Sequence, residues 1–176
     1  MSSQSNKIYF EEIQRFRQPW IWWLILPVCL FGIVVFSYII YKQLVLGQPV
    51  GNNPMPDSML IWFGPLMIIV CGGMLLLLYF MKLHVQIDSQ TIHVRFIPFF
   101  KKDLLLKNIS TFRARQYKPI REFGGWGIRW GPGGRAYNVS SDWGVQLEFT
   151  DGRKLLIGSQ SADEFTAAIE AAIKSK

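Results

Sequence analysis

Two long uninterrupted apolar segments are the feature that most constrains this chain. Residues 20–41 and residues 58–81, which are 22 and 24 residues long, contain no Asp, Glu, Lys, Arg or His. As helices they are about 33–36 Å long, enough to cross the ~30 Å hydrocarbon layer of a bilayer. A helix in the core of a soluble domain has no reason to be apolar on every face over this length. We therefore predict a transmembrane hairpin at residues 20–81, with a short outer loop at residues 42–57.

Charged residues around the hairpin predict its orientation. Three basic residues precede the first segment and four follow the second, whereas the loop contains only one: Lys7, Arg15 and Arg17; Lys82, Arg95, Lys101 and Lys102; Lys42. Basic residues favour the cytoplasmic side of a membrane, so we expect both termini there and the loop outside. A cleaved signal peptide is disfavoured for the first segment because no small-residue cleavage site follows Tyr41.

Particular residues in and before the spans have predicted roles. Aromatic residues near the span ends are interpreted as membrane-interface anchors: Trp20, Trp22, Trp23, Tyr38 and Tyr41. Small residues within the spans are interpreted as helix-packing positions: Cys29, Gly64, Cys71 and Gly72. Residues 1–19 form a leader for which two interpretations stay open, an interfacial helix or a partly ordered tail. Its apolar residues fall loosely on one side of a helix: Ile8, Phe10, Ile13 and Phe16.

After the second span the apolar period changes to two, which indicates strands. Leu83, Val85 and Ile87 alternate with polar residues, and so do Ile92, Val94 and Phe96 after a short turn. Further strands are predicted at residues 109–116, 126–130, 135–139, 143–149 and 153–158, with a turn rather than a strand at 101–107. Asp151-Gly152 is typical of a hairpin turn.

The end of the chain favours a helix. Ser161 and Glu164 match a capping box. One apolar stripe follows at helical spacing, formed by Phe165, Ala168, Ile169, Ala172 and Ile173. Residues 82–176 are therefore predicted to form a cytoplasmic domain of about seven antiparallel strands closed by one helix. With the hairpin, the fold class is an α+β membrane protein.

Three stretches carry a resemblance to a known family. The strand pair LHVQIDSQTIHVRF, the segment FGGWGIRW and the segment AYNVSSDWGVQLEFTDGRKLLIGSQ, followed by a closing helix, resemble bacterial pleckstrin-homology-like membrane proteins over residues 83–175. The resemblance implies a bent, barrel-like sheet with a capping helix in a protein of the bacterial inner membrane. It implies no catalytic residue, and no motif of the eukaryotic phosphoinositide site is present.

No residue pattern predicts catalysis or a cofactor. Six glycines crowd residues 124–134, but no Gly-Lys-Ser/Thr follows them, and turns between strands explain them better than a phosphate loop. His84 and His93 are the only histidines and would leave a metal site short of ligands. The cysteines and carboxylates show no spacing that suggests nucleophilic or acid–base chemistry. We expect no enzyme activity, no catalytic or metal site, and no cofactor.

A basic segment is the strongest candidate for binding. Residues 95–135 carry a net charge of +8, more than the +7 of the whole chain. The ten basic residues are Arg95, Lys101, Lys102, Lys107, Arg113, Arg115, Lys118, Arg121, Arg129 and Arg135. Two interpretations stay open: a basic face toward anionic lipid, and solvated strand edges that discourage aggregation.

These observations predict a non-catalytic binding or scaffold module anchored in the inner membrane. Its domain would dock a protein partner or anionic lipid headgroups through the basic face. The alternative is an accessory subunit of a larger membrane complex, assembled through its helices. The lipid bilayer and a protein in the membrane are the expected partners, and nucleic acid is disfavoured because the aromatic residues are better explained as sheet core.

Overall fold

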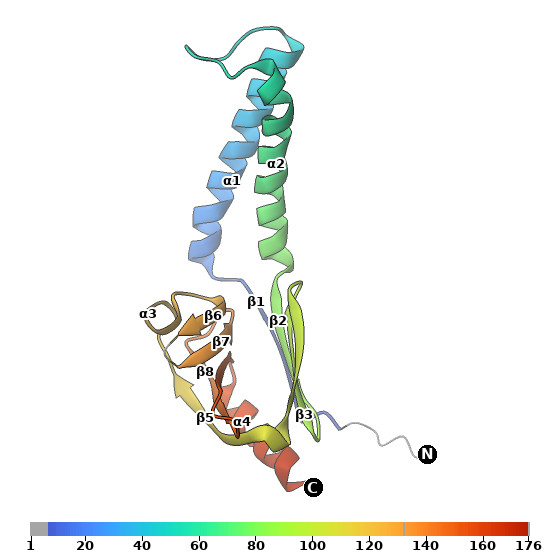
Figure 1. Cartoon of the computed structure of the whole chain (residues 1–176), viewed down its shortest axis with the longest axis vertical. Coiled ribbons are helices and arrows are strands. Elements are labelled where there is room, and N and C mark those ends of the chain that lie inside the picture. Colours follow the sequence, from blue (N-terminus) through green and yellow to red (C-terminus); the bar gives the residue numbers. More distant parts are fainter. Residues whose placement is uncertain (1–6, 132, 176) are drawn as a thin grey trace, which may run out of the picture. The chain divides into compact units, whose positions relative to one another are not determined.

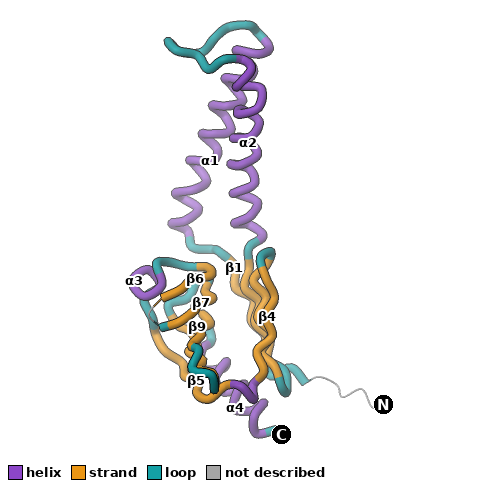
Figure 2. The backbone as a smooth tube through the Cα atoms, in the orientation of Figure 1, coloured by secondary structure: helices purple, strands orange, loops and turns teal. Residues whose placement is uncertain are grey.

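The chain folds into two compact units, both drawn in Figures 1 and 2. The computed structural model describes residues 7–131 and 133–175. One unit, Arg17–Tyr79, is helical, and the other joins the described residues before Arg17 to those from Phe80 onward. The second unit consists mostly of strands and is called the β-rich domain below. It is built from both ends of the chain.

The helical unit is a pair of apolar helices. α1 is Pro19–Ile40 and continues into a short π-helix, η1 (Tyr41–Val45), and α2 is Asp57–Phe80. Pro19 begins α1 where its missing N–H leaves no hydrogen bond unmade. The most apolar windows of the two helices have mean hydropathies of 2.5 and 2.3, so by length and composition both are candidates to cross a membrane. The bounds differ from the predicted spans by one residue at each end.

Small residues set how closely the two helices approach. A Cβ atom added to Gly64 would lie 2.8 Å from Ile40 Cδ1, and one added to Gly32 would lie 3.1 Å from Cys71 Sγ. Gly64 and Cys71 therefore pack inside the pair. A Cβ added to Gly72 would meet no atom within 4 Å. Of these predicted packing positions, Gly64 and Cys71 therefore lie between the two helices, whereas the surroundings of Gly72 are open.

The remaining predicted positions of the helical unit differ in exposure. Cys29 is buried and, like Cys71, forms no disulfide. Four of the five aromatic anchors are exposed within the chain, and Trp22 is half-buried; the exposed ones are Trp20, Trp23, Tyr38 and Tyr41. Apolar side chains that face outward from a helix pair are more favourable in contact with lipid than with water.

One sheet of the β-rich domain, sheet A, has the strand order β1-β2-β3-β4 with all neighbours antiparallel. Its strands are β1 (Phe10–Arg15), β2 (Lys82–Ile87), β3 (Thr91–Ile97) and β4 (Phe100–Leu105). Alternate residues of β2 and β3 are fully buried, as the period of two predicted: Leu83, Val85, Ile87, Ile92 and Val94. Burying each such side chain contributes about 1.5–3 kcal/mol.

Two strands of sheet A, β1 and β4, differ from the sequence-based predictions. The leader is not an interfacial helix, because Phe10–Arg15 is an edge strand paired with β2; residues 1–6 of the leader lie outside the described residues. The segment 101–107, predicted as a turn, is mostly strand β4, followed by the short 3-10 helix η2 (Leu106–Asn108). The charged side chains of β4 hid its alternation, since an edge strand tolerates them.

The second sheet, sheet B, has the order β5-β8-β9-β7-β6. Its strands are β5 (Ile109–Gln116), β6 (Gly127–Gly131), β7 (Gly134–Asn138), β8 (Trp143–Phe149) and β9 (Lys154–Gly158). A short helix, α3 (Pro119–Phe123), precedes β6. β7 and β9 run parallel, and the other neighbours are antiparallel. The predicted Asp151-Gly152 turn joins β8 to β9, with Gly152 at a positive φ.

The last helix, α4 (Ala162–Lys174), packs mainly against β5 and β8 of sheet B and also against β1 and β2 of sheet A. Its buried residues are Ala162, Phe165, Ala168, Ile169 and Ala172, which confirms most of the predicted stripe, but Ile173 is exposed. Ser161 is the N-cap residue, yet its side chain makes no cap hydrogen bond. Instead its backbone N–H donates to Ser159 Oγ.

Strand β1 ties the two sheets together. The Phe10 ring stacks on Phe165 of α4, with 5.1 Å between the ring centroids. The Glu12 carboxylate accepts hydrogen bonds from the Ser159 hydroxyl at 2.6 Å and the Gln160 N–H at 2.7 Å. The buried Gln14 side chain donates to the Gly158 carbonyl at 2.7 Å. Six amino-terminal residues therefore help to hold a domain that is otherwise carboxy-terminal.

The architecture is α+β, but the described strands do not form the predicted single bent barrel. They form two separate sheets with nine strands rather than about seven, no barrel is closed, and one strand pair is parallel. The physical reason is that β7 pairs with β9 instead of its sequence neighbour β8, which leaves β6 as the edge of sheet B. Pairing between distant segments is not encoded in local alternation.

Candidate functional site: a basic cleft in the β-rich domain

A cleft of about 490 Å³ opens beside the end of β4. Three parts of the chain line it: residues 102–105 of β4, the β6–β7 turn region, and the β8–β9 turn region. The charged and aromatic side chains that line it are Lys102, Asp103, Trp130, Arg135, Phe149, Arg153 and Lys154. We call this site the basic cleft, because it contains four basic side chains and one carboxylate.

The turns of sheet B bring the basic side chains of the cleft together. Trp130 and Arg135 lie directly opposite each other on β6 and β7, and the Arg135 guanidinium carbon lies 5.0 Å from the centroid of the Trp130 ring. Arg153 lies over Phe149 in the same way at 5.6 Å. A guanidinium held on an aromatic face keeps its N–H donors directed outward and remains charged. The two arginines are therefore pre-positioned donors.

The charges of the cleft are only partly neutralised. Lys154 Nζ lies 2.9 Å from Glu148 Oε1, and Arg153 lies 2.6 Å from Asp151 Oδ2. These hydrogen bonds and charges hold the pKa of the Glu148 and Asp151 carboxyls below their ordinary values. Within the described chain, Lys102 and Arg135 make no ion pair. The positive charge available to a ligand is therefore that of Lys102 and Arg135.

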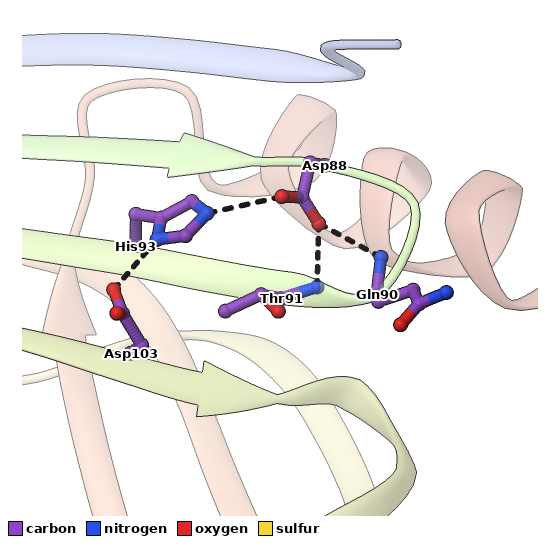
Figure 3. Close-up of polar contacts among 5 residues, drawn as sticks. All are labelled: Asp88, Gln90, Thr91, His93 and Asp103. Atoms are coloured by element: carbon purple, nitrogen blue, oxygen red, sulfur yellow. Dashed lines mark hydrogen bonds and ion pairs between the residues drawn. The ribbon is translucent and has the colours of Figure 1, made fainter. Parts of the chain in front are cut away.

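A histidine is held between two carboxylates, as Figure 3 shows, and one of these carboxylates, Asp103, also lines the cleft. His93 Nδ1 is 2.6 Å from Asp103 Oδ1, and His93 Nε2 is 3.0 Å from Asp88 Oδ2. Asp88 is buried, and its other oxygen accepts the backbone N–H groups of Gln90 and Thr91 at 2.8 and 2.7 Å. The network fixes the turn between β2 and β3.

The protonation of His93 follows from these contacts. Partial burial of the ring alone lowers its pKa, but the hydrogen bonds and negative charges of Asp103 and Asp88 outweigh burial, so the pKa is raised. Both ring nitrogens have an acceptor beside them, and only the imidazolium donates from both. Asp103, which also lines the cleft, is thus compensated by His93 rather than by Lys102.

The structure distributes the ten predicted basic residues over several places. Lys102 and Arg135 meet in the cleft, and Arg95 lies opposite Lys101 on the outer face of sheet A. Arg115 on β5 bonds Glu122 and Gln146. The others lie around η2, β5, α3 and β6, and they are Lys107, Arg113, Lys118, Arg121 and Arg129. Arg129 donates to the Trp126 carbonyl.

Sequence reasoning missed two of the four basic residues of the cleft. Arg153 and Lys154 lie outside residues 95–135, directly after the Asp151-Gly152 turn. The hairpin signal locates these bases at the end of a strand, but only the fold brings that end beside β4. Among the described residues, no group of three or more His, Cys, Asp and Glu side chains is placed to hold a metal ion.

The fold defines an α+β class of protein in which a pair of long apolar helices is inserted between the first and second strands of a two-sheet domain. The chain belongs to the family of unknown function DUF6141, whose profile matches residues 1–176. No match was found among curated proteins. The family match does not identify a pleckstrin-homology-like domain, so that resemblance stays a prediction.

Proposed function

We propose that the chain is a non-catalytic module, anchored in a membrane by α1 and α2, whose basic cleft binds an acidic, extended segment of a partner protein. The observation that supports the proposal is the uncompensated positive charge of Lys102 and Arg135 in one cleft. Carboxylates presented to these groups would replace water as their partners. Charge-assisted hydrogen bonds of this kind are stronger than neutral ones.

Edge strands on both sides of the cleft favour a peptide as the ligand. Among the described strands, β4 is the last of sheet A and β6 is the last of sheet B, so each has one side without a neighbouring described strand. An extended segment gains main-chain hydrogen bonds along such an edge, and its alternate side chains enter neighbouring pockets. Acidic residues at alternate positions would then face Lys102 and Arg135.

Membrane anchoring is the second part of the proposal. α1 and α2 are long and apolar enough to span a bilayer, and the flanking basic residues favour an inner-membrane protein with both termini in the cytoplasm. Extraction of membranes with alkaline carbonate should leave the full chain in the pellet. Recovery of the chain in the supernatant would contradict the anchoring.

The cleft is tested with the full chain in lipid nanodiscs, because β1 belongs to the domain and precedes the helices. The probe is a fluorescent peptide of alternating glutamate and valine, and its binding is measured by anisotropy. Lys102→Glu combined with Arg135→Glu should weaken binding at least about tenfold, since two attractive charges become repulsive.

Arg121→Glu is the matched control, because Arg121 is an exposed base on α3 that does not line the cleft. This variant should bind the peptide within about twofold of the parent. Equal weakening by both charge reversals would show a general charge effect and contradict the cleft. Absence of peptide binding by the parent chain would contradict the proposed ligand class.

An accessory subunit is the second candidate, and the open surroundings of Gly72 favour it. Neither Gly72 nor the adjacent Gly73 has any atom within 4 Å of an added Cβ, so this part of α2 is free to receive another helix. Gly72→Leu should then abolish co-purification of a membrane partner while peptide binding persists. Unchanged co-purification would argue against assembly through this surface.

A further inference from the structure

The outward face of sheet A is polarised along its strands. The register places its side chains in rows that cross the sheet. One row consists of Glu11, Gln86, His93 and Asp103, and the next consists of Ile13, His84, Arg95 and Lys101. A third row, at the strand ends that continue toward α1 and α2, consists of Arg15, Lys82 and Ile97. Carboxylates therefore lie toward one end and basic residues toward the other.

Two cross-strand pairs at the basic end have like charges. Arg15 lies directly opposite Lys82, and Arg95 lies directly opposite Lys101. Like charges in directly opposed positions destabilise a sheet unless an anion lies between them. The carboxylates of this face are already engaged elsewhere, since Glu11 lies 2.8 Å from His84 and Asp103 lies 2.6 Å from His93.

These four basic residues have no anionic partner of their own. In the part of the chain that the structure describes, none of them makes an ion pair. Arg15, Arg95 and Lys101 are exposed, and Lys82 is half-buried. Two adjacent pairs of unpartnered cations on one sheet surface thus form a site for an anionic surface.

The connections to the helices identify that surface. β1 ends at Arg15, and α1 begins at Pro19; α2 ends at Phe80, and β2 begins at Lys82. At about 3.5 Å per residue, chain length alone limits Arg15 to about 14 Å from Pro19 and Lys82 to about 7 Å from Phe80. Those distances are comparable to the Debye length of about 8–10 Å. If the helices span a bilayer, both bases are held within electrostatic reach of its headgroups.

An exposed aromatic residue lies at the same end of the sheet. The turn between β3 and β4 follows Ile97, which pairs with Lys82, and it contains Phe99. Phe99 is 53% exposed, although its ring also lies near Phe96. An apolar ring beside cations is suited to the boundary between headgroups and acyl chains.

We infer that Arg15, Lys82, Arg95 and Lys101, together with Phe99, form a docking surface for the anionic headgroups of the membrane in which the helices lie. We call this surface the basic end of sheet A. Headgroup phosphates neutralise the two like-charge pairs, and Phe99 enters the interfacial layer. The inference rests on the membrane anchoring of the proposed function but not on the basic cleft, which is lined by different residues.

Hydrogen exchange of the full chain in nanodiscs tests this surface. Discs of pure phosphatidylcholine are compared with discs in which one third of the lipid is phosphatidylglycerol. Backbone amides of residues 96–101 should exchange about fivefold more slowly in the anionic discs. The free energy of attraction between one base and an anionic surface corresponds to a fold-change of this size. High salt should remove the difference.

Arg95→Glu combined with Lys101→Glu should abolish the difference between the two kinds of disc. The milder pair Arg95→Gln with Lys101→Gln, which avoids new charges, should reduce it. Lys107→Glu is the control, because Lys107 is exposed on η2, beyond the opposite end of β4, and should leave the difference intact. Protection that persists in both double variants would overturn the inference.

Two further results separate this inference from its alternatives. Inorganic phosphate added to phosphatidylcholine discs should not reproduce the protection, and an equal effect would indicate a site for free anions instead. Failure of membrane anchoring appears as a chain that does not enter discs and is released by alkaline carbonate. Failure of the docking surface appears as an inserted chain with equal exchange in both discs, whatever its cleft binds.

Discussion

Sheets A and B lie in one domain but are assembled differently. In sheet A the strands follow one another in chain order and every neighbour is antiparallel, although the helices interrupt the chain between β1 and β2. In sheet B the order is permuted, and β7 runs parallel to β9. Sheet A therefore depends on one distant strand, whereas sheet B depends on a close approach of β7 to β9 that Gly134 allows.

The largest effect is expected from disrupting the parallel pairing of β7 with β9 in sheet B. Gly134 begins β7 at a φ of +94°, and a Cβ there would collide with the Lys154 carbonyl oxygen. Gly134→Ala should therefore lower the free energy of unfolding by about 3 kcal/mol or more, because backbone strain and overpacking add. Denaturant unfolding of the full chain in detergent, followed by tryptophan fluorescence, measures the change.

Gly152→Ala is the control for that substitution. Gly152 also has a positive φ, +82°, but nothing lies within 4 Å of its added Cβ. It should cost only about 1–2 kcal/mol, from backbone strain alone. Equal losses of unfolding free energy for the two variants would show that the pairing of β7 with β9 does not require close packing at Gly134.

An intermediate effect is expected from loosening β1 of sheet A. Glu12→Ala removes the acceptor of the Ser159 hydroxyl and the Gln160 N–H, and should destabilise the domain by about 2 kcal/mol. Glu11→Ala, on the neighbouring exposed position, should cost less than about 1 kcal/mol. Unfolding midpoints of the two variants make the comparison, and a reversed order would contradict the role given to β1.

The smallest effect is expected from the His93 network, which links β3 to β4 and to the turn between β2 and β3 within sheet A. The pKa of His93 is raised in the folded state, so the folded state binds the proton more tightly. The resulting stabilisation is complete below the unfolded pKa of about 6.5 and is lost as the pH rises through the folded pKa.

His93→Gln should therefore lower stability by less than about 1 kcal/mol near pH 6, because Asp103 is largely exposed, and by less still at higher pH. Denaturation midpoints of the parent and the variant between pH 5.5 and 8.5 measure this trend. A difference that grows with pH would mean that His93 is held neutral.

The same contrast explains how much of the fold the sequence predicts. The hairpin of β2 and β3 was predictable, because apolar and polar residues alternate on both sides of a short turn. The apolar residues are Leu83, Val85 and Ile87 before the turn, and Ile92, Val94 and Phe96 after it. β1 was not, since its apolar residues also fit a helical face and its partner lies beyond both helices. The parallel pair of β7 and β9 has no local signal, because strand direction is decided by the whole sheet.

The sequence predicts that the candidate site is basic, but not which residues form it. Lys102 and Arg135 belong to the basic segment that composition singles out, but nothing in their spacing indicates that they share a cleft. That neighbourhood depends on the turns that bring Arg153 and Lys154 beside β4. The stacking of Arg135 on Trp130 follows from the register of β6 and β7, which is set once the hairpin forms.

The placement of β1 has a consequence for how the protein is made. Phe10–Arg15 leaves the ribosome before its partner Lys82–Ile87, which is synthesised only after residues 16–81. β1 therefore has no partner while both apolar helices are synthesised, and closing so long a loop is entropically costly and slow. Sheet A is therefore completed only after both helices have been synthesised, and until β1 pairs, β2 is an open edge strand.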